Sequence, residues 1–336
     1  MSEPPYPLHE SIRDLLDPEY AAFYNEHLIN KQQVHFQPLH VSRASGVLIP
    51  GAGPLLPVGE TRDITITRRE STGPDILVRS FTPAADEPPD GGWPVLLYYH
   101  GGGWVLGNID TENVVCTNIC ARANCVVITT DYRLAPEHPF PAAVEDSWET
   151  FLWVHCEGSR LLNLDTNRVA VGGSSAGGNL AAVMAHRSIA RSFPPLKLQL
   201  LNVPVMDNTA DVSSNRSYAA YQHTPALPAA KMLWFRNHYL PSPIDGYQPQ
   251  ASPLLYSDDA PTWHQQPHAI VVVGELDVLR EEGEQYAAKL KKHGSTVELH
   301  VMRRQPHPFL AMDGVLQAGR QAITFMVEGC KLAFSQ

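Results

Sequence analysis

The chain has 336 residues, of which 43% are hydrophobic, and its formal net charge at pH 7 is −10. This length and composition suffice for one large hydrophobic core with a smaller attached domain. The Lys and Arg residues are dispersed and form no run longer than two residues, which excludes nucleic acid as an expected partner.

The amino terminus lacks the features of a targeting segment. Residues 1–5 carry neither a basic region nor an apolar region, and no stretch is apolar for long enough to span a bilayer. We therefore expect a cytoplasmic protein without a membrane span. The five cysteines agree, because they are odd in number and lack the spacing of a disulfide framework. Cys116 and Cys120 stand one helical turn apart, as two metal ligands would, but buried free thiols are the more ordinary interpretation.

The first eighty residues change from helical to strand periodicity. Residues 1–34 read as amphipathic helix, with a helix start at Asp17–Glu19, where Pro occupies the first turn. One face of that helix carries Tyr20, Phe23, Tyr24, His27 and Leu28. Residues 44–59 are rich in Gly and Pro and predict a linker. Alternating residues at 64–67 and 76–81, separated by turn residues, predict a hairpin.

Strands and helices alternate along most of the remaining chain. Apolar runs typical of buried strands occupy residues 95–99, 126–130, 169–171, 196–201, 270–273 and 297–302. Helices are predicted at residues 111–123, 142–154, 176–192, 281–293 and 315–334. This alternation predicts an α/β fold with a mostly parallel sheet. Residues 206–250 interrupt it with a polar stretch and a helix at 229–239, so this insertion and the amphipathic amino terminus are the natural pieces of a lid.

The pentapeptide Gly173–Gly177 fits the pattern G-x-S-x-G, with Ser175 at the serine position. It lies between a predicted strand and a predicted helix, where a sharp turn would lift the serine clear of the sheet edge. The small residues suit such a turn, because a strained backbone that passes close to its neighbours excludes most Cβ atoms. A flexible turn without chemistry would give the same five residues, so other parts of the chain must decide.

A second glycine-rich segment, His100–Trp104, directly follows a predicted buried strand. Three consecutive glycines leave N–H groups unshielded, and such a loop can aim them at an oxyanion, together with the N–H of Ala176. The alternative is a phosphate-binding loop or a plain flexible loop. A phosphate-binding loop would need a following Lys-Ser/Thr or a G-x-G-x-x-G helix start, and the sequence has neither.

A serine nucleophile needs a base and an acid that orients the base, and in the α/β-hydrolase order the acid comes before the histidine. Glu275 and Asp277 follow the strand predicted at 270–273, and Asp277 is the preferred acid. Its alternative role is the N-cap of the helix that follows. Asp258 and Asp259 lie in a predicted exposed loop and are weaker candidates.

Three late histidines compete for the role of base. His293 ends a helix in Lys-Lys-His-Gly, as a capping residue would. His300 lies within an alternating strand, on its polar side. His307 lies in the loop after that strand, where the histidine of a catalytic triad belongs, and it is the preferred base.

Several longer blocks of sequence resemble the hormone-sensitive lipase family of α/β-hydrolases. They cover roughly residues 60–330 and are His100–Trp104, Asp131–Glu137, Pro139–Ala143, Gly173–Gly178, Ala251–Leu254 and Asp277–Gly283. The resemblance implies a serine carboxylesterase that acts on small or medium acyl esters and needs no metal or organic cofactor. It implies Ser175 as nucleophile, His307 as base and Asp277 as orienting acid, with the N–H groups of Gly102, Gly103 and Ala176 as oxyanion hole.

The same resemblance implies a sheet of about eight strands beneath a helical cap. The cap would combine residues 1–50 with the insertion 206–250, and the catalytic core would combine 51–205 with 251–336. Cap aromatics are candidates for lining the pocket, namely Phe23, Tyr24, Tyr218, Tyr221, Trp234 and Phe235. A small-molecule ester is the expected partner, and a homodimer through the last strand and helix is common in such folds.

Two positions depart from the family pattern. Ser174 stands where the family often has Asp, and Pro308 follows His307 where the family usually has Gly. Proline biases the preceding residue toward an extended backbone, which bears on the geometry of His307. Two further functions use the same fold: a biosynthetic acyltransferase or thioesterase with the same triad, and a small-molecule receptor. All three triad residues are present here, which argues against a receptor.

Overall fold

The computed structural model describes residues 4–44, 50–85 and 87–335, and eight strands form one central sheet. Their order across the sheet is β1-β2-β4-β3-β5-β6-β7-β8. The strands are β1 (Glu60–Ile66), β2 (Ile76–Thr82), β3 (Trp93–Tyr99), β4 (Val126–Thr130), β5 (Leu164–Ser174), β6 (Leu198–Asn202), β7 (His268–Gly274) and β8 (Val297–Met302). The first two strands form an antiparallel hairpin and β3 to β8 run parallel. The predicted α/β fold with a mostly parallel sheet of about eight strands is confirmed.

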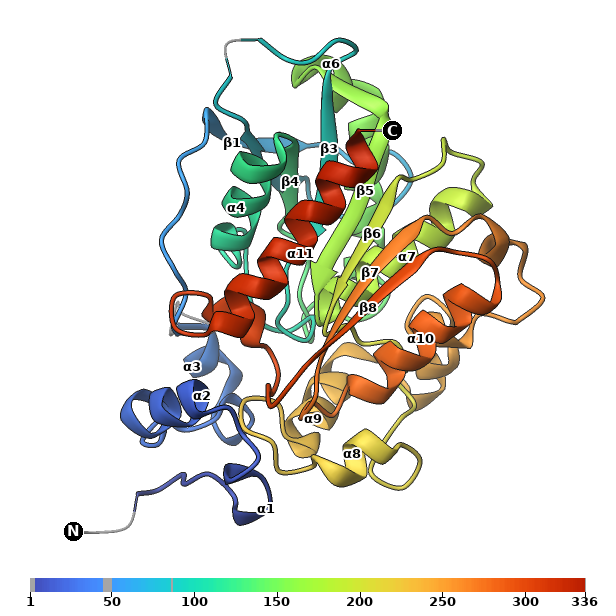
Figure 1. Cartoon of the computed structure of the whole chain (residues 1–336). Coiled ribbons are helices and arrows are strands. Elements are labelled where there is room, and N and C mark those ends of the chain that lie inside the picture. Colours follow the sequence, from blue (N-terminus) through green and yellow to red (C-terminus); the bar gives the residue numbers. More distant parts are fainter. Residues whose placement is uncertain (1–3, 45–49, 86, 336) are drawn as a thin grey trace.

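Helices cover both faces of this sheet, as Figure 1 shows. On one face lie α4 (Asn113–Ala123) and α11 (Gln317–Phe334), and on the other α5 (Ala142–Trp153), α7 (Ala176–Ala190) and α10 (Arg280–Lys292). Successive residues of a strand point to opposite faces. In β3, accordingly, Leu96 and Tyr98 pack in the core with α4 and α11, while Leu97 and Tyr99 pack in the core with α5, α7 and α10. Burial on both faces explains why these strands are apolar throughout.

Two further groups of helices lie together at the end of the sheet where the parallel strands have their carboxyl ends (Figure 1). The amino-terminal group comprises α1 (Glu10–Arg13), α2 (Pro18–Phe23), a π-helical turn at 24–28, a 3-10 turn at 34–36 and α3 (Leu39–Ala44). The insertion after β6 contributes α8 (Arg216–Ala220), α9 (Ala229–Tyr239) and a 3-10 helix at 243–247. Shorter elements elsewhere are a π-helical turn at 154–158, α6 (Ser159–Leu161) and 3-10 turns at 253–255, 261–265 and 309–312.

The amino-terminal group is fixed to the core by main-chain contacts near the end of β8. The predicted helix start is confirmed, because Asp17 Oδ1 accepts a hydrogen bond from the Glu19 N–H at 2.8 Å. The Arg304 guanidinium donates to the carbonyls of residues 14, 15 and 16. Tyr20 and Tyr24 are buried, whereas His27 on the same predicted face is exposed. The buried stripe is therefore narrower than the periodicity predicts.

The observed bounds of strands and helices agree best with the predicted ones where the apolar pattern of the sequence is strongest. The hairpin 64–67 with 76–81 is confirmed, and α9 has the predicted bounds. By contrast, β5 begins at Leu164, before its predicted apolar core of 169–171, because its first half is half-exposed and polar. The short helix α8 was not predicted, since five residues carry little periodicity and its start depends on an Asn215 side-chain cap. In the predicted linker, residues 50–59 contain no helix or strand, and residues 45–49 lie outside the described residues.

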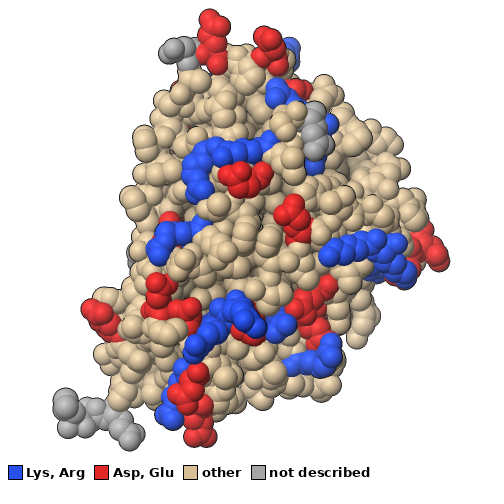
Figure 2. Space-filling model, viewed as in Figure 1, with Lys and Arg blue, Asp and Glu red and all other residues tan. Residues whose placement is uncertain are grey.

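The surface and the cysteines bear on the expected partners. On the face in Figure 2, basic and acidic side chains are interspersed and form no large patch of one sign. No helix in the described ranges has the length and apolar character needed to cross a membrane. All five cysteines are free, and of these only Cys156 is exposed. Within the same ranges, no group of three or more His, Cys, Asp or Glu side chains is arranged to hold a metal ion.

A buried histidine in α7 makes the stability of this fold depend on pH. The ring of His186 stacks on Tyr256 at 3.9 Å, and its Nδ1 lies 2.8 Å from Thr262 Oγ1. Burial lowers the pKa of His186 from 6.5 to about 3. The unfolded chain therefore binds a proton below pH 6.5 that the folded protein does not, so the contribution of His186 to stability is complete above pH 6.5 and is lost as the pH falls toward 3.

We predict that His186→Gln, which keeps a polar group for Thr262 but cannot titrate, removes this pH dependence. The free energy of unfolding of the wild type minus that of the variant should fall by up to ~1.4 kcal/mol for each pH unit between pH 6 and 4. Urea unfolding at several pH values measures the difference. Parallel curves for the two proteins would contradict the prediction.

Candidate active site

The parallel strands bring the predicted site residues to one edge of the sheet. Strand β5 ends at Ser174, β7 at Gly274 and β8 at Met302, and these strands pair in register through β6. Ser175 directly follows β5, Asp277 lies in the loop after β7, and His307 lies in the loop after β8. The carboxyl ends of parallel strands in an open α/β sheet are where such folds place their binding crevices.

Ser175 occupies the turn between β5 and α7 with a left-handed backbone, at φ 55° and ψ −116°. Its N–H donates to the carbonyl of Asn202, which fixes the turn on the neighbouring strand. The flanking glycines are required by close packing. A Cβ on Gly177 would lie 1.8 Å from the Tyr99 carbonyl oxygen, and one on Gly173 would lie 2.5 Å from the same atom. The pentapeptide is therefore a strained, closely packed strand-to-helix turn.

Asp277 and His307 form a buried pair. His307 Nδ1 lies 2.8 Å from Asp277 Oδ2, and the side chains are almost inaccessible to solvent. The other carboxylate oxygen, Oδ1, accepts a hydrogen bond from the Leu279 N–H just before α10. Asp277 thus holds the imidazole and also accepts from the N–H of Leu279, which is itself the N-cap of α10, so the alternative role of Asp277 as the N-cap is wrong. With Nδ1–H donated to a carboxylate, Nε2 is the nitrogen left to act as a base.

The other acidic candidates are engaged away from His307. Glu275 accepts a hydrogen bond from the Arg304 N–H at 2.7 Å. Asp258 pairs with Lys289 and Lys292 at the surface, and Asp259 is exposed. Among the candidates named from the sequence, Asp277 is the acid that contacts a histidine.

The other two histidines are held by aromatic stacking. The His293 ring stacks on Trp263, and the His300 ring stacks on Phe325 of α11 at 3.8 Å. His307 is followed by Pro308, whose peptide bond is cis, and it still contacts Asp277. The departure at position 308 is therefore compatible with the acid–base pair.

The glycine loop after β3 supplies unpaired N–H groups beside Ser175. Gly102 and Gly103 have φ angles of 118° and 62°, and a Cβ on Gly102 would lie 2.2 Å from the Leu106 carbonyl oxygen. The N–H groups of Gly102, Gly103 and Ala176 donate to no protein acceptor within the described residues. The loops are adjacent, since a Cβ on Gly101 would lie 3.6 Å from Ser175 Cβ. Such N–H groups can stabilise an oxyanion.

Aromatic stacking holds both ends of the glycine loop His100–Trp104. The His100 ring stacks on Tyr132 at 4.2 Å, and its Nδ1–H donates to the Gly101 carbonyl at 2.7 Å. The Tyr132 hydroxyl donates to the His100 carbonyl. Burial lowers the pKa of His100 to about 4, so this imidazole is neutral at neutral pH. Trp104, at the end of the loop, stacks on Tyr239 of α9 at 4.0 Å, which joins the loop to the insertion.

The sequence analysis missed one polar residue at this site, Glu112. One of its carboxylate oxygens accepts a hydrogen bond from the Ser174 hydroxyl, and the other accepts one from the Gly101 N–H at 3.3 Å. The departure from Asp at position 174 was the available signal, because a missing carboxylate raises the question of what replaces it. The replacement comes from a different loop, which the sequence does not place near Ser174.

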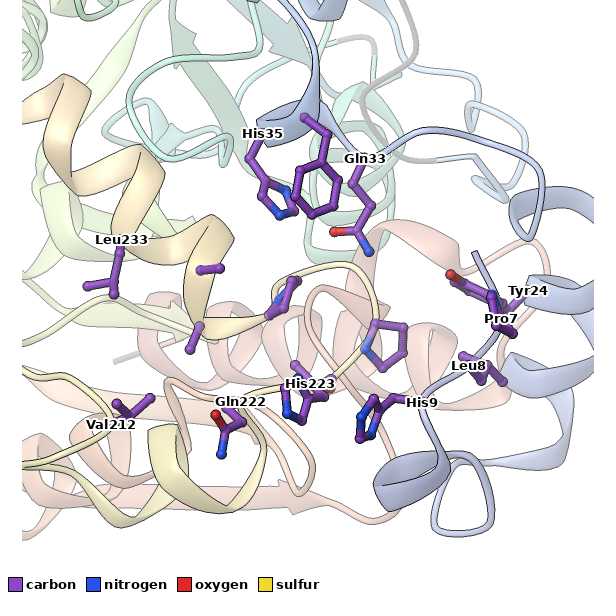
Figure 3. A pocket seen from close by; sticks show the side chains of 16 residues that line it. Pro7, Leu8, His9, Tyr24, Gln33, His35, Val212, Gln222, His223 and Leu233 are labelled. Atoms are coloured by element: carbon purple, nitrogen blue, oxygen red, sulfur yellow. The ribbon is translucent and has the colours of Figure 1, made fainter. Parts of the chain in front are cut away.

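A cavity of about 430 Å³ lies between the amino-terminal segment and the insertion (Figure 3). Its walls are largely apolar and carry no Lys, Arg, Asp or Glu side chain. The polar groups in it include three histidines, of which His9 and His223 stack on each other at 4.1 Å from the two sides. Burial lowers the pKa of His35 to about 4, so this imidazole is neutral at neutral pH. The lining is that of a site for an uncharged organic group.

None of the predicted triad residues lines the cavity. One of its walls is nevertheless formed by α9, the helix that also contacts the glycine loop after β3. Leu233 of α9 lines it, while Phe235, two residues further along the same helix and therefore on another side of it, has its ring 2.3 Å from where a Gly103 Cβ would be. Of the six aromatics predicted to line a pocket, Tyr24 does so. The other five do not line this cavity: Tyr218, for example, is fully buried, and the ring of Trp234 packs on Phe235 and His238.

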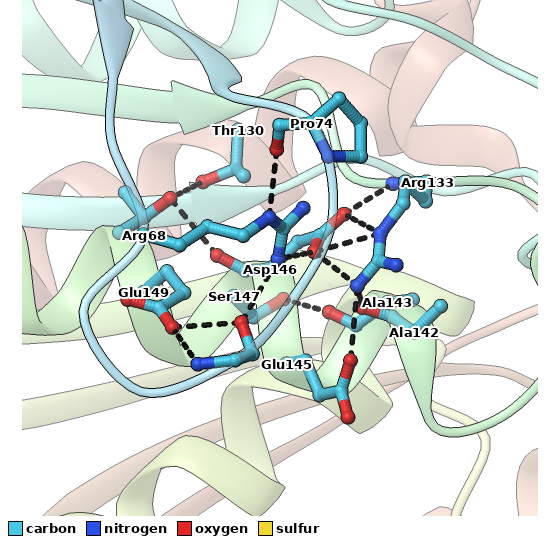
Figure 4. A network of polar contacts seen from close by, with 12 residues as sticks. Arg68, Pro74, Thr130, Arg133, Ala142, Ala143, Glu145, Asp146, Ser147 and Glu149 are labelled. Carbon is cyan, nitrogen blue, oxygen red and sulfur yellow. Dashed lines mark hydrogen bonds and ion pairs between the residues drawn. The ribbon is translucent and has the colours of Figure 1, made fainter.

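The block that follows β4 is anchored by a buried ion-pair network, drawn in Figure 4. Asp146 of α5 accepts hydrogen bonds from the Arg133 N–H and guanidinium and forms an ion pair with Arg68 at 2.7 Å. Glu145 pairs with the outer edge of Arg133. Because Arg133 adjoins Tyr132, this network fixes the segment that supports the oxyanion loop.

Comparison with known proteins gives consistent matches along the chain. Residues 96–311 match the family model described as the alpha/beta hydrolase fold. The chain is 46% identical over 320 residues to an AB hydrolase superfamily protein of Schizosaccharomyces pombe, covering 94% of this chain and 93% of that protein. It is 33% identical over 270 residues to ethyl acetate hydrolase of Pseudomonas putida, covering 79% and 80%. A solved structure of a hyperthermophilic esterase from Pyrobaculum calidifontis matches with a TM-score of 0.84 at 33% identity, covering 94% and 98%.

We predict that Asp146→Asn destabilises the protein far more than the neighbouring change Glu145→Gln. Removing the buried charge leaves two guanidinium groups without their carboxylate, which costs about 3–5 kcal/mol in comparable buried pairs, whereas a half-exposed pair costs less than about 1 kcal/mol. Chemical denaturation of both variants gives the two free energies of unfolding. Equal losses would show that the Asp146 pairs contribute no more than a surface contact.

Proposed function

We propose that this chain, which belongs to the hormone-sensitive lipase family of α/β-hydrolases and is a carboxylic ester hydrolase, cleaves small to medium acyl esters through an acyl-enzyme intermediate on Ser175. The observation that carries this proposal is the buried hydrogen bond between Asp277 and His307, at the sheet edge where Ser175 occupies its strained turn. The ester hydrolases among its relatives, including ethyl acetate hydrolase, support the substrate class.

In the proposed mechanism, Ser175 Oγ attacks the ester carbonyl carbon and His307 Nε2 takes the hydroxyl proton. Asp277 holds the imidazole and stabilises the imidazolium that forms. Negative charge develops on the carbonyl oxygen, where the unpaired N–H groups of Gly102, Gly103 and Ala176 can donate to it. His307 then gives its proton to the leaving alcohol, and a water molecule repeats the cycle to release the acid.

We assign residues 1–50 and 206–250 to a cap over a core built from residues 51–205 and 251–336. Two contacts support this division. The stacked His9 and His223 rings join the two parts of the proposed cap, and Arg43 reaches the core, where it donates to the Val105 and Ala135 carbonyls. The cavity between the two cap parts is largely apolar and carries no Lys, Arg, Asp or Glu side chain, so we propose that it receives the apolar part of the ester that lies away from the scissile bond.

We predict that the wild type hydrolyses p-nitrophenyl acetate and butyrate and that Ser175→Ala lowers kcat/KM by at least ~10³-fold, because the nucleophile is lost. Release of p-nitrophenolate measures the rate. Ser188→Ala, a buried serine later on α7, is the matched control and should retain activity. A folded wild type that is inert on every ester would contradict the proposal and favour a receptor. Transfer of the acyl group to an added alcohol in preference to water would favour an acyltransferase.

We predict that Leu233→Trp selectively slows the hydrolysis of long esters. The indole would fill the cavity, so kcat/KM for p-nitrophenyl octanoate should fall roughly tenfold or more, while the value for the acetate stays within about twofold. Asn237→Trp, at an exposed position one turn further along the same helix that does not line the cavity, controls for the substitution itself. If both esters slow equally, the cavity does not hold the acyl group.

A further inference from the structure

Glu112 holds an unusual position for a residue with no part in the proposed mechanism. It immediately precedes α4 with a left-handed backbone, at φ 64°, and its side chain makes no hydrogen bond to that helix. The partly buried carboxylate instead points at two other loops. It accepts hydrogen bonds from the Ser174 hydroxyl of the nucleophile turn and from the Gly101 N–H of the oxyanion loop.

Both donors stand next to atoms that take part in the chemistry. Ser174 directly precedes the nucleophile Ser175. Gly101 precedes Gly102, and its carbonyl is held on the other side by His100 Nδ1 at 2.7 Å. With its N–H fixed by Glu112 and its carbonyl fixed by His100, Gly101 has little freedom to rotate. The Gly102 N–H belongs to the same planar peptide unit as the Gly101 carbonyl, so these two bonds set its direction.

The two loops meet without room for another group. A Cβ on Gly101 would lie 3.0 Å from Ser174 Oγ and 3.3 Å from the Ser174 carbonyl oxygen. The carboxylate of Glu112 is thus the polar link across the contact. A displacement of either loop by as little as an ångström would move oxyanion donors relative to Ser175 Oγ, and errors of that size lower rates strongly.

The charge at this contact explains the serine at position 174. Among the described residues, no Lys or Arg forms an ion pair with Glu112. Burial raises the pKa of Glu112, and the Ser174 and Gly101 hydrogen bonds and the nearby His307 oppose that rise. An Asp at position 174 would put a second carboxylate against the first, and like charges at this distance repel. Ser174 and Glu112 are therefore a matched pair, one donating where the other accepts.

We infer that Glu112 is a positioning residue that locks the oxyanion loop onto the nucleophile turn through Gly101 and Ser174. The inference rests on the proposed function, because it concerns how well Gly102 and Gly103 are aimed at the oxyanion on Ser175. It assigns Glu112 no contact with the substrate. Its removal should therefore lower kcat and leave KM nearly unchanged.

The test compares Glu112→Ala, Glu112→Gln and Ser174→Ala with Asp110→Ala, an exposed carboxylate of the same loop. On p-nitrophenyl butyrate, Glu112→Ala should lower kcat ~100-fold with KM within ~3-fold. Glu112→Gln, which keeps an acceptor oxygen, should stay within ~10-fold of the wild type. Ser174→Ala should lower kcat ~3–10-fold. The double variant Glu112→Ala/Ser174→Ala should have the same kcat as Glu112→Ala alone, because the hydrogen bond between the two residues is already lost. Asp110→Ala should match the wild type.

A second measurement separates this inference from the proposed function. A p-nitrophenyl phosphonate labels an activated serine: the Ser175 Oγ–P bond forms, the bond from phosphorus to p-nitrophenolate breaks, and His307 takes the hydroxyl proton. Intact-protein mass reports the rate of labelling without ester turnover. Glu112→Ala should label more slowly than the wild type by about the factor lost in kcat. If the wild type neither reacts with the phosphonate nor hydrolyses esters, the proposed esterase function is contradicted, and with it the inference about Glu112.

Equal labelling and equal kcat in wild type and Glu112→Ala would overturn the inference while leaving the esterase intact. Thermal unfolding of each variant checks that it is folded. If Glu112→Ala does not fold, the Glu112→Gln and Ser174→Ala pair decides. Their combined effect on kcat should be smaller than the product of the single effects, and multiplication of the two effects would show that the residues act independently.

Discussion

The left-handed backbone of Ser175 is the constraint on which the rest of this site depends. A φ of 55° is costly for a residue with a side chain, and it persists only because the neighbouring structure over-determines it. The Asn202 carbonyl holds the Ser175 N–H, and the Tyr99 carbonyl lies so close that Gly173 and Gly177 cannot carry side chains. The turn therefore places Ser175 directly after β5 and starts α7 at Ala176, so the proposed nucleophile and one proposed oxyanion donor come from one strained junction.

In this part of the molecule, two buried carboxylates are held by fixed protein partners. One carboxylate oxygen of Asp277 contacts His307, and the other accepts a hydrogen bond from the Leu279 N–H. Asp146 forms ion pairs with both Arg68 and Arg133. Groups held in this way cost little reorganisation when charge moves during a reaction. The same principle underlies the role inferred for Glu112, whose two oxygens join two loops that are distant in the sequence.

The residues proposed for chemistry and the cavity proposed to receive the substrate lie in different parts of the molecule. The predicted triad and oxyanion donors come from loops of the sheet, whose positions are set by strand pairing. The cavity is instead walled by the amino-terminal segment and the insertion, which meet through the His9 and His223 rings. Segments outside the sheet can change in sequence without disturbing strand register, which suits a scaffold that keeps one reaction and varies its substrates.

The sequence by itself determined the fold class and the residues proposed for chemistry. Doubly buried strands are apolar throughout, and a tight turn over Ser175 demands small residues, so both leave strong local patterns. The tertiary structure decided what depends on contacts between distant segments: that Tyr24 rather than Tyr218 lines the cavity, and that a carboxylate from Glu112 faces Ser174. Local sequence cannot specify these contacts, because each is created by the packing of loops whose own residues show no periodicity.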